Sequence, residues 1–257
     1  MATQVNRATS ARRPVKAASR PAPAASNAAK SDTAPDASET LTDRAYRLIE
    51  EMLVTLKIAP GTLMSELELA KQLGISRTPV GEALSRLSRT GLVTVLPRRG
   101  FIATEISITQ QLRMLELRRE VARLVARLAA LRATPAQRTE LLAVARQFAR
   151  AVKNGDEHEY MAADQTFHQL VAQCAQNDYA VQVLETLDSQ TRRFWFAHRH
   201  QAGAELEVVA PLHAQLAAAI EQGDADKAGS VSDALCEYLE RFARATLDPF
   251  MPSARNG

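Results

Sequence analysis

The chain has 257 residues, of which 46% are hydrophobic and 24% charged, and its formal net charge is only +3. This composition is typical of a globular protein of one or two domains. The low net charge does not indicate a polyanionic partner, so binding partners have to be inferred from local clusters of charge. Two cysteines, Cys174 and Cys236, are too few for a disulfide framework, and no apolar run approaches the roughly 18 residues that span a bilayer, so we expect a cytoplasmic protein.

Residues 1–40 are rich in Ala, Ser, Pro and Arg and contain almost no large apolar side chains. Such a segment buries too little surface to offset the entropy of ordering, so we expect a disordered extension. Its Arg-rich, acid-poor composition also occurs in transit peptides. A basic tail with weak affinity for DNA and a plain linker are the other interpretations. Residues 251–257 are expected to form a disordered tail.

Residues 41–106 contain three helical patterns followed by two short strands. The second helix begins at Ser65, which forms a capping box with Glu68, and the third begins after the N-cap residue Ser76 and ends at Gly91. The period then changes to two in "LVTVL" and "FIATEI", which flank the turn "PRRG". This order of elements predicts a winged helix-turn-helix domain.

Residues 107–250 have helical periodicity throughout. Breaks at "RATP", "KNGD", "AQND", "HQAGAE" and "EQGDAD" separate six helices, near 108–132, 135–154, 156–175, 178–200, 204–222 and 225–247. Short breaks place consecutive helices antiparallel. The sequence therefore predicts a mainly α protein, in which an N-terminal winged helix-turn-helix is followed by an all-α six-helix bundle.

The third helix and the hairpin tip carry the residues expected to meet DNA. In helix-turn-helix proteins the N-terminal residues of the recognition helix reach the base edges of the major groove. Arg77 has the planar fork that reads guanine, and the hydroxyls of Ser76 and Thr78 suit phosphate. Arg98 and Arg99 lie where a wing meets the DNA backbone or minor groove. Basic helices and turns also occur as ordinary solvated surface, and some winged helices bind proteins instead.

The stretch "LELAKQLGISRTPVGEALSRLSRTGLVTVLPRRGFIAT" resembles the winged helix of the GntR family of bacterial transcription regulators, through the framework "LA..LG.SRTPV.EAL.RL...GLV...P.RG". The resemblance implies that Arg77 and Thr78 contact operator DNA and that Gly100 lets the wing approach the duplex. The family commonly has an arginine where this chain has Gly81. The departure implies either a changed operator preference or a closer approach of the helix to the duplex.

In the helical half, Asp164 and His168 are four residues apart and share one helical face. Most other residues of that face are apolar, and the same is true around His213 on a later helix, so both faces are expected to point inward. A carboxylate and two imidazoles in one bundle core can bind Zn²⁺ or Ni²⁺. The same residues also fit a core in which Asp164 bonds His168 and His213 is an ordinary buried histidine.

Arg118 is also expected to face inward, because its helical neighbours are mostly apolar. A guanidinium on an apolar face usually meets an anion, for example in an internal salt bridge with Asp164. The stretch "TRRFWFAHRHQ", residues 191–201, concentrates Arg, His and the only Trp of the chain. Its polar residues can line the same interior, although periodicity does not select which of them face inward.

Residues 108–247 resemble the ligand-binding domain of the FadR subgroup of the GntR family. The resemblance implies a bundle that dimerises and binds a small organic acid, often through a divalent metal, with Arg118 on the effector's carboxylate. The subgroup's metal ligands are an Asp and a His four residues apart, followed by two later His. Here Leu235 stands at the last of these positions, so three protein ligands remain: Asp164, His168 and His213.

These observations predict a homodimeric, sequence-specific regulator that binds double-stranded operator DNA and acts as a repressor. Its affinity for DNA would be controlled by a small carboxylate, with metal assistance, bound in the helical domain. One alternative is a metal-dependent hydrolase that uses the Asp/His/His cluster, although no nucleophile motif or general base accompanies it. The other is a metal sensor without an organic effector.

Overall fold

The computed structural model describes residues 39–200 and 206–247. The extension expected at residues 1–40 and the tail expected at 251–257 lie outside the described residues, apart from Glu39 and Thr40. These two are ordered, because the Thr40 hydroxyl caps the first helix and the Glu39 carboxylate pairs with Arg47 at 3.0 Å. The described structure therefore begins at Glu39, two residues before the boundary expected at residue 41.

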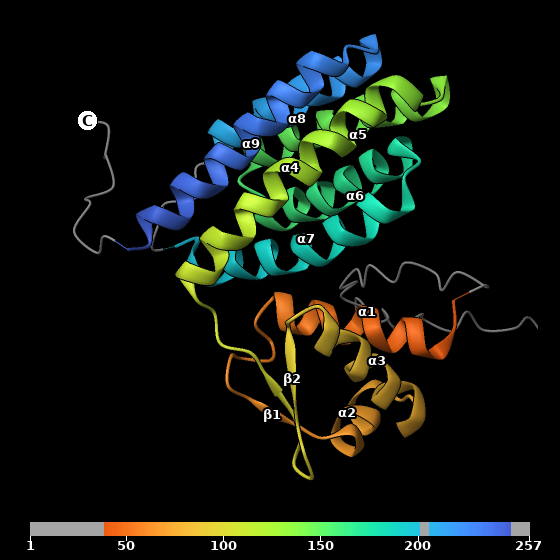
Figure 1. Ribbon diagram of the computed structural model, residues 1–257, viewed down its shortest axis with the longest axis vertical. Coiled ribbons are helices and arrows are strands. Elements are labelled where there is room, and N and C mark those ends of the chain that lie inside the picture. The colour runs from red at the N-terminus through yellow and green to blue at the C-terminus, as the bar shows by residue number, and fades with distance from the viewer. Residues whose placement is uncertain (1–38, 201–205, 248–257) are drawn as a thin grey trace, which may run out of the picture. The chain divides into compact units, whose positions relative to one another are not determined.

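The first part of the chain forms three helices and a small antiparallel sheet (Figure 1). The elements are α1 (Leu41–Val54), β1 (Leu63–Met64), α2 (Glu66–Leu73), α3 (Arg77–Arg89), β2 (Val93–Leu96) and β3 (Gly100–Ala103). β2 and β3 form the expected hairpin, and β1 pairs with the other edge of β3. The expected winged helix is confirmed. β1 was not expected, because two residues are too few to show a period.

Helix starts in this domain follow the capping signals with one exception. The Ser65 hydroxyl accepts a hydrogen bond from the backbone N–H of Glu68 at 3.2 Å, as the capping pattern predicts. Ser76 occupies the N-cap position of α3, but its side chain forms no capping hydrogen bond. The predicted N-cap position of Ser76 is therefore confirmed, although its hydroxyl does not form the capping hydrogen bond.

The second part of the described chain is entirely helical (Figure 1). The helices are α4 (Ile108–Arg132), α5 (Pro135–Asn154), α6 (Glu157–Ala175), α7 (Asp178–His198), α8 (Leu206–Gln222) and α9 (Ala225–Ala245). They match the six expected helices within a few residues at each end. The start of α5 shows why: Thr134 and Gln137 form a complete capping box, which fixes that boundary in the sequence.

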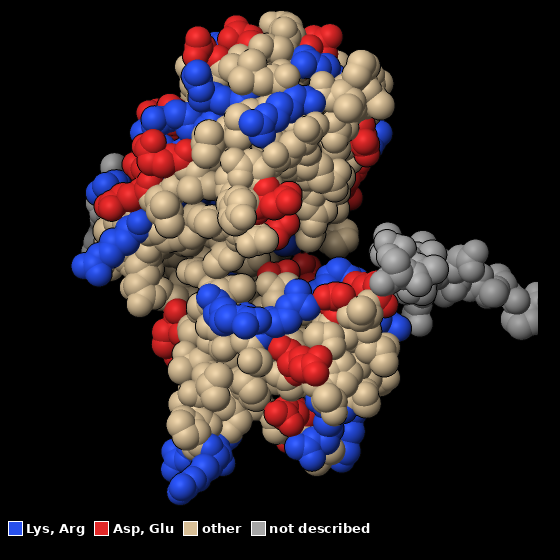
Figure 2. Space-filling model, turned by 45° about the vertical axis from the view of Figure 1, so that its right-hand side comes forward, with Lys and Arg blue, Asp and Glu red and all other residues tan. Residues whose placement is uncertain are grey.

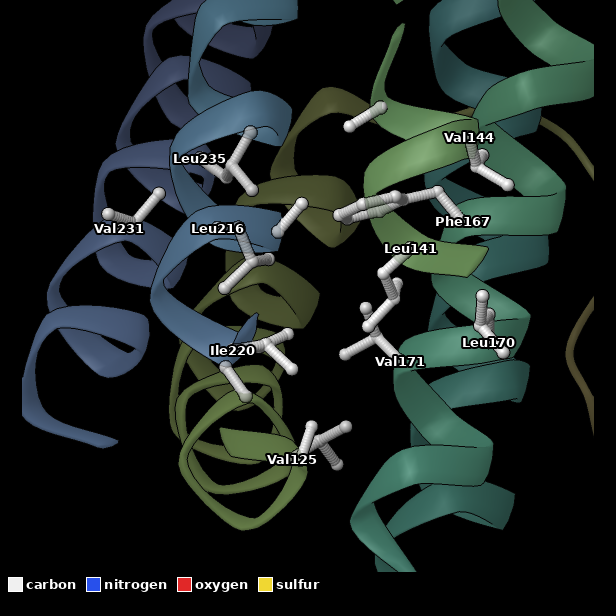
Figure 3. Packing of buried hydrophobic residues seen from close by; sticks show 14 of the residues in the cluster. Val125, Leu141, Val144, Phe167, Leu170, Val171, Leu216, Ile220, Val231 and Leu235 are labelled. Atoms are coloured by element: carbon white, nitrogen blue, oxygen red, sulfur yellow. The ribbon is translucent and has the colours of Figure 1, made fainter. Parts of the chain in front are cut away.

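Two hydrophobic clusters lie within the described residues, one in each part of the fold. In the winged helix, Ile49, Leu53 and Leu84 are completely buried. Figure 3 shows the interior of the bundle, where labelled side chains from α4, α5, α6, α8 and α9 point into a shared core that includes Phe167 and Ile220. Each large side chain buried in this way contributes roughly 1.5–3 kcal/mol. Among the described helices, none combines the length and hydropathy needed to cross a membrane.

Candidate functional site

The expected DNA-contacting residues are exposed at the start of α3 and at the hairpin tip. Ser76, Arg77 and Thr78 are exposed where α3 begins. Arg98 and Arg99 are exposed in the turn between β2 and β3. In Figure 2, Lys and Arg side chains gather at the projecting tip of this hairpin, at the bottom of the view. The geometry brings basic side chains to the two places where a winged helix meets a duplex.

Arg77 is not free in this structure, because its Nη2 lies 3.1 Å from Glu66 Oε2 at the start of α2. Gly81 lies next to the same carboxylate: a Cβ built on Gly81 would be 3.1 Å from Glu66 Oε1. A glycine at position 81 therefore leaves room for the Glu66 carboxylate that holds Arg77. The sequence pattern did not reveal this contact, because it joins residues of two different helices.

Gly100 has a structural requirement within the domain. Its φ of +95° lies in a region that side-chain-bearing residues rarely adopt, and a Cβ there would be 2.8 Å from the carbonyl oxygen of Met64 in β1. The close approach of β1 to β3 thus needs glycine at this position. Its expected closeness to DNA stays a prediction.

In the bundle, Asp164 and His168 of α6 meet His213 of α8, as the sequence pattern predicted. Asp164 Oδ1 lies 3.5 Å from His168 Nε2 and 3.3 Å from His213 Nε2. The candidate ligand atoms all lie within 4.8 Å of one another. Phe148 stacks on the His213 ring with a centroid separation of 4.1 Å, which fixes the plane of that imidazole.

The hydrogen bonds of His213 test whether a metal fits. Its Nδ1 lies 3.2 Å from the Val209 carbonyl oxygen, which can only accept, and 3.5 Å from the Tyr160 hydroxyl, which can also donate. We assign the proton to Nδ1 from the shorter of these contacts. Nε2 then presents a lone pair to Asp164 Oδ1 at 3.3 Å and has no hydrogen-bond partner. In this tautomer two acceptors face each other, and a bound cation would satisfy both, whereas in the other tautomer Nε2 would donate to Asp164. Bonds of about 2.1 Å in a tetrahedral site separate ligand atoms by about 3.4 Å, which matches both separations from Asp164.

The electrostatics of Asp164 and His213 fit the same interpretation, whereas those of His168 favour its charged form. Burial by itself would raise the pKa of Asp164, but the neighbouring His168 and His213 outweigh it and hold this pKa well below its usual range. Burial lowers the pKa of His213, so this imidazole stays neutral. Burial opposes the charged form of His168 too, but the Asp164 carboxylate outweighs it and raises the His168 pKa. A carboxylate anion and a neutral His213 are the forms that bind a metal.

Arg118 faces inward, as expected, but its partner is not the one suggested by the sequence. Its Nη1 donates to Asp188 Oδ1 of α7, and the Arg118 side chain is only 6% exposed. Its Nε is buried and has no hydrogen-bond partner. Sequence analysis missed Asp188. The pattern that predicted an inward Arg118 could have found Asp188 as well, because Asp188 has the apolar helical neighbours Leu184 and Leu187.

A cavity of about 650 Å³ joins these groups. Asp164, His168 and His213 line it together with Arg118 and Asp188. Apolar side chains of the bundle form part of the wall, among them Val125, Val171, Leu216, Leu235 and Leu239. Residues of the winged helix line the rest, among them Tyr46, Glu50, Arg86 and Thr90. The volume is ordinary for a small-molecule site with a few convergent polar groups. Leu235, at the position of the missing histidine, gives the wall an apolar side chain that cannot bind a metal.

Of the stretch at residues 191–201, Thr191 and Arg192 line the cavity. Arg193 is buried but turns elsewhere, since its Nη2 donates to the Thr104 carbonyl at 2.6 Å. Residue 201 lies outside the described part of the chain. The expectation that this stretch reaches the cavity is therefore confirmed for two of its residues.

Helix α7 also touches elements of the winged helix. Next to Asp188, the Ser189 hydroxyl donates to Glu50 Oε1 of α1 at 2.7 Å, and Gln190 Nε2 donates to the Thr90 carbonyl at 2.6 Å. Arg193 adds its bonds to Thr104. One turn of α7 thus carries a cavity carboxylate and contacts to the domain that holds α3.

The fold and these sites define a winged-helix DNA-binding regulator whose helical domain lines most of a cavity of small-molecule size. Residues 41–102 match the family of bacterial regulatory proteins named gntR, and residues 113–240 match the FCD domain. The chain belongs to the GntR family, with the FCD-type domain that fits its FadR subgroup.

Named relatives support this assignment. The HTH-type transcriptional repressor RspR of Escherichia coli is 28% identical over 80% of this chain and 88% of its own length. The Nta operon transcriptional regulator of Aminobacter aminovorans is 34% identical over 57% of this chain and 68% of its own length. The solved structure of E. coli McbR/YncC has the same fold, with a TM-score of 0.72 at 22% identity over 82% of this chain and all of that one.

These relatives are transcription regulators, so the protein is a transcription regulator and not an enzyme. The hydrolase alternative is therefore set aside. The Asp/His/His cluster then needs a role in sensing or in structure.

Proposed function

We propose that the protein is a homodimeric cytoplasmic repressor whose affinity for operator DNA is set by a small carboxylate bound with a divalent metal in the helical domain. The observation that carries this proposal is the buried His213 Nε2, which has no hydrogen-bond partner and lies 3.3 Å from Asp164 Oδ1. With the proton of His213 on Nδ1, this pair of acceptors favours a bound cation over an ordinary core histidine.

For DNA recognition, we assign base contact to Arg77 and phosphate contact to Ser76 and Thr78. Their exposure at the start of α3 supports this assignment. Arg98, Arg99 and Gly100 form the wing contact. Because Glu66 pairs with Arg77 in this structure, base contact requires Arg77 to exchange the Glu66 carboxylate for a base edge or phosphate.

For metal binding, Asp164, His168 and His213 would hold a Zn²⁺ or Ni²⁺ class ion. A bound ion would supply a Lewis-acidic centre with open positions for water or an effector oxygen. Leu235 removes the fourth protein ligand and places an apolar wall beside the open positions. Affinity for metal is therefore expected to be lower than in a site with four protein ligands.

For the effector, Arg118 is the carboxylate receptor. Its unpartnered buried Nε supports this role, since a buried guanidinium N–H without an acceptor is costly. Asp188 competes for the same guanidinium, so an effector carboxylate must displace Asp188 or share Arg118 with it.

We connect the cavity to DNA binding through α7. A ligand that pulls Arg118 away from Asp188 changes the environment of the turn that also contacts Glu50 and Thr90. The ligand controls DNA affinity if this turn of α7 has two arrangements that differ in their affinity for the ligand and in their affinity for DNA.

Metal content and calorimetry test the proposal. The purified protein would be stripped with chelator, titrated with Zn²⁺ and with Ni²⁺, and compared with Asp164→Ala. Saturable binding of one ion per chain that Asp164→Ala abolishes supports the proposal. Equal binding by both proteins contradicts it. A promoter-reporter assay with and without the gene then decides whether regulation is negative.

A pure metal sensor is the second candidate, and the pairing of Arg118 with Asp188 favours it because the guanidinium already has an anion. Removal of the metal changes DNA affinity without any organic acid only if this second candidate is correct.

A further inference from the structure

A second, smaller cavity lies beside the link between β3 and α4, residues 104–107. Its volume is about 40 Å³, and none of the residues that line it lines the larger cavity. We name it the link cavity; its polar lining includes Ser107, Gln110, Gln111, Gln190 and Arg193. One water needs roughly 10–15 Å³ of such space. The link cavity therefore has room for a monatomic ion or a few waters, and not for an organic acid.

The guanidinium of Arg193 brings a buried positive charge to the link cavity. Arg193 is only 3% exposed. Its Nη1 donates to the Thr104 hydroxyl at 2.9 Å and its Nη2 to the Thr104 carbonyl at 2.6 Å, and both acceptors are neutral. Its Nε is buried and has no hydrogen-bond partner. A buried charge without a counter-charge is costly, so this guanidinium favours the binding of an anion.

The one acidic residue that lines the link cavity, Glu105, does not pair with Arg193. A Cβ built on Gly61 would lie 2.8 Å from Glu105 Oε1, so this carboxylate lies beside Gly61. Its charge raises the pKa of Arg193, but burial outweighs that effect and keeps this pKa below its usual value. Among the described residues, no carboxylate forms an ion pair with Arg193. The charge of Arg193 therefore lacks a neutralising partner in this part of the chain.

The start of α4 adds two further features that attract an anion. This helix of 25 residues begins at Ile108 after the N-cap residue Ser107, and its N-terminus carries a partial positive charge. Gln111 in its first turns is only 6% exposed. The Gln111 side chain lines the link cavity and forms no hydrogen bond with another described residue. Its amide can therefore offer two N–H donors to a ligand.

We propose that the link cavity binds one chloride ion, held by the Arg193 guanidinium, the Gln111 amide and the N-terminus of α4. Charge selects an anion, and a volume of about 40 Å³ selects a monatomic one. A water molecule would satisfy one N–H group but would leave the charge of Arg193 without a counter-charge. This site lies outside the metal and effector cavity and goes beyond the proposed function.

A chloride ion at this position contacts segments that are far apart in the sequence. The link runs from the sheet of the winged helix to α4 (Figure 1), and Arg193 belongs to α7. Gln190, which lines the same cavity, donates to the Thr90 carbonyl at the end of α3. Binding of the ion is therefore expected to stabilise the junction of the link with α4 and α7.

Chloride titration of the metal-free protein tests the site. The protein would be stripped with chelator and titrated with sodium chloride at constant ionic strength, with sodium gluconate as the balancing salt because gluconate is too large for the cavity. The line width of the chlorine NMR signal reports binding. Wild type is expected to show saturable excess broadening that bromide reverses by competition. Arg193→Gln should weaken chloride binding by about tenfold or more.

Three further variants separate the site from general charge effects. Gln111→Met keeps the side-chain size, removes the amide donors and should weaken chloride binding several-fold. Glu105→Gln removes a like charge and should bind chloride at least as tightly as wild type. Arg132→Gln is the matched control, because Arg132 also donates to a backbone carbonyl, that of Ala175 at 2.8 Å, but lies outside the link cavity. This control should bind chloride as wild type does.

Two results overturn the proposal. One is the absence of saturable chloride binding by wild type, and the other is equal binding by wild type and an Arg193→Gln variant that circular dichroism shows to be folded. A wild-type crystal grown in sodium bromide gives a readout that needs no variant. An anomalous peak in the link cavity beside Arg193 supports the proposal, whereas an ordered water there without anomalous signal contradicts it.

Discussion

The buried guanidinium of Arg118 in α4 is paired with the carboxylate of Asp188 in α7, 70 residues further along the chain. This pair decides how an anion can enter the cavity, because the best anion receptor of the interior already holds an internal anion. The next residue, Ser189, also lines the cavity, and its hydroxyl donates to Glu50 of α1.

The first prediction concerns this pair. Asp188→Asn removes the competing charge, so the metal-loaded variant should bind small carboxylates such as malonate or citrate more tightly, by about tenfold or more. Isothermal calorimetry measures the change. Glu185→Gln is the control, since Glu185 also lines the cavity but is not paired with Arg118. Unchanged or weaker carboxylate binding by Asp188→Asn would show that Arg118 does not receive the effector.

The second prediction concerns Leu235. Leu235→His supplies the fourth ligand that the cavity wall lacks, and should strengthen zinc binding by about tenfold or more. Competition with a chromophoric chelator gives the affinity. Leu239→His provides a matched control, because Leu239 lines the same cavity. Equal affinity in the wild type and Leu235→His would place the metal away from this wall.

The third prediction concerns the ion pair that holds Arg77. Glu66→Gln frees the guanidinium and removes a negative charge near the duplex, so DNA affinity should rise for all sequences. Because an exposed ion pair of this kind is weak, the expected increase in DNA affinity is a factor of about 1.5 to 5. Fluorescence anisotropy at fixed salt measures it. Glu68→Gln changes the same charge on the same helix without touching Arg77, and a similar gain there would assign the effect to net charge alone.

The fourth prediction concerns the wing. Gly100→Ala combines a positive φ with a contact of 2.8 Å to the Met64 carbonyl, and should lower the free energy of unfolding by about 1–3 kcal/mol. Urea denaturation provides the measurement. Gly74→Ala has a similar φ, but its Cβ would meet no atom within 4 Å, so it isolates the backbone cost. Equal losses of unfolding free energy in the two variants would mean that β1 moves away from the added methyl group without a cost in stability.

The sequence was sufficient for features that local physics determines. Breaks such as "RATP" and a strong helical period predicted the six bundle helices. Apolar neighbours predicted the inward positions of Arg118 and His213, which are buried, and of Asp164, which is partly buried. Contacts between segments that are distant along the chain could not be predicted from the sequence. Nothing local indicates that Arg118 meets Asp188 instead of Asp164, since both carboxylates lie on inward faces.

The same limit explains Gly81. On the sequence it marks a side chain missing from the DNA face of α3, whereas the structure shows a space beside the Glu66 carboxylate. That carboxylate comes from α2, and its position depends on how the two helices pack. The role of Gly81 therefore depends on the packing of α2 against α3, which the sequence of α3 alone does not reveal.

The most direct test is a titration of wild-type protein and Arg77→Ala onto an operator selected from random DNA, and onto a scrambled duplex, at one salt concentration. Wild type should bind the operator at least about 1,000-fold more tightly than the scrambled duplex. Arg77→Ala should lose roughly 1–3 kcal/mol on the operator and relax the preference at one base pair. Equal wild-type affinity for both duplexes would contradict the account, as would an Arg77→Ala variant that retains full operator affinity.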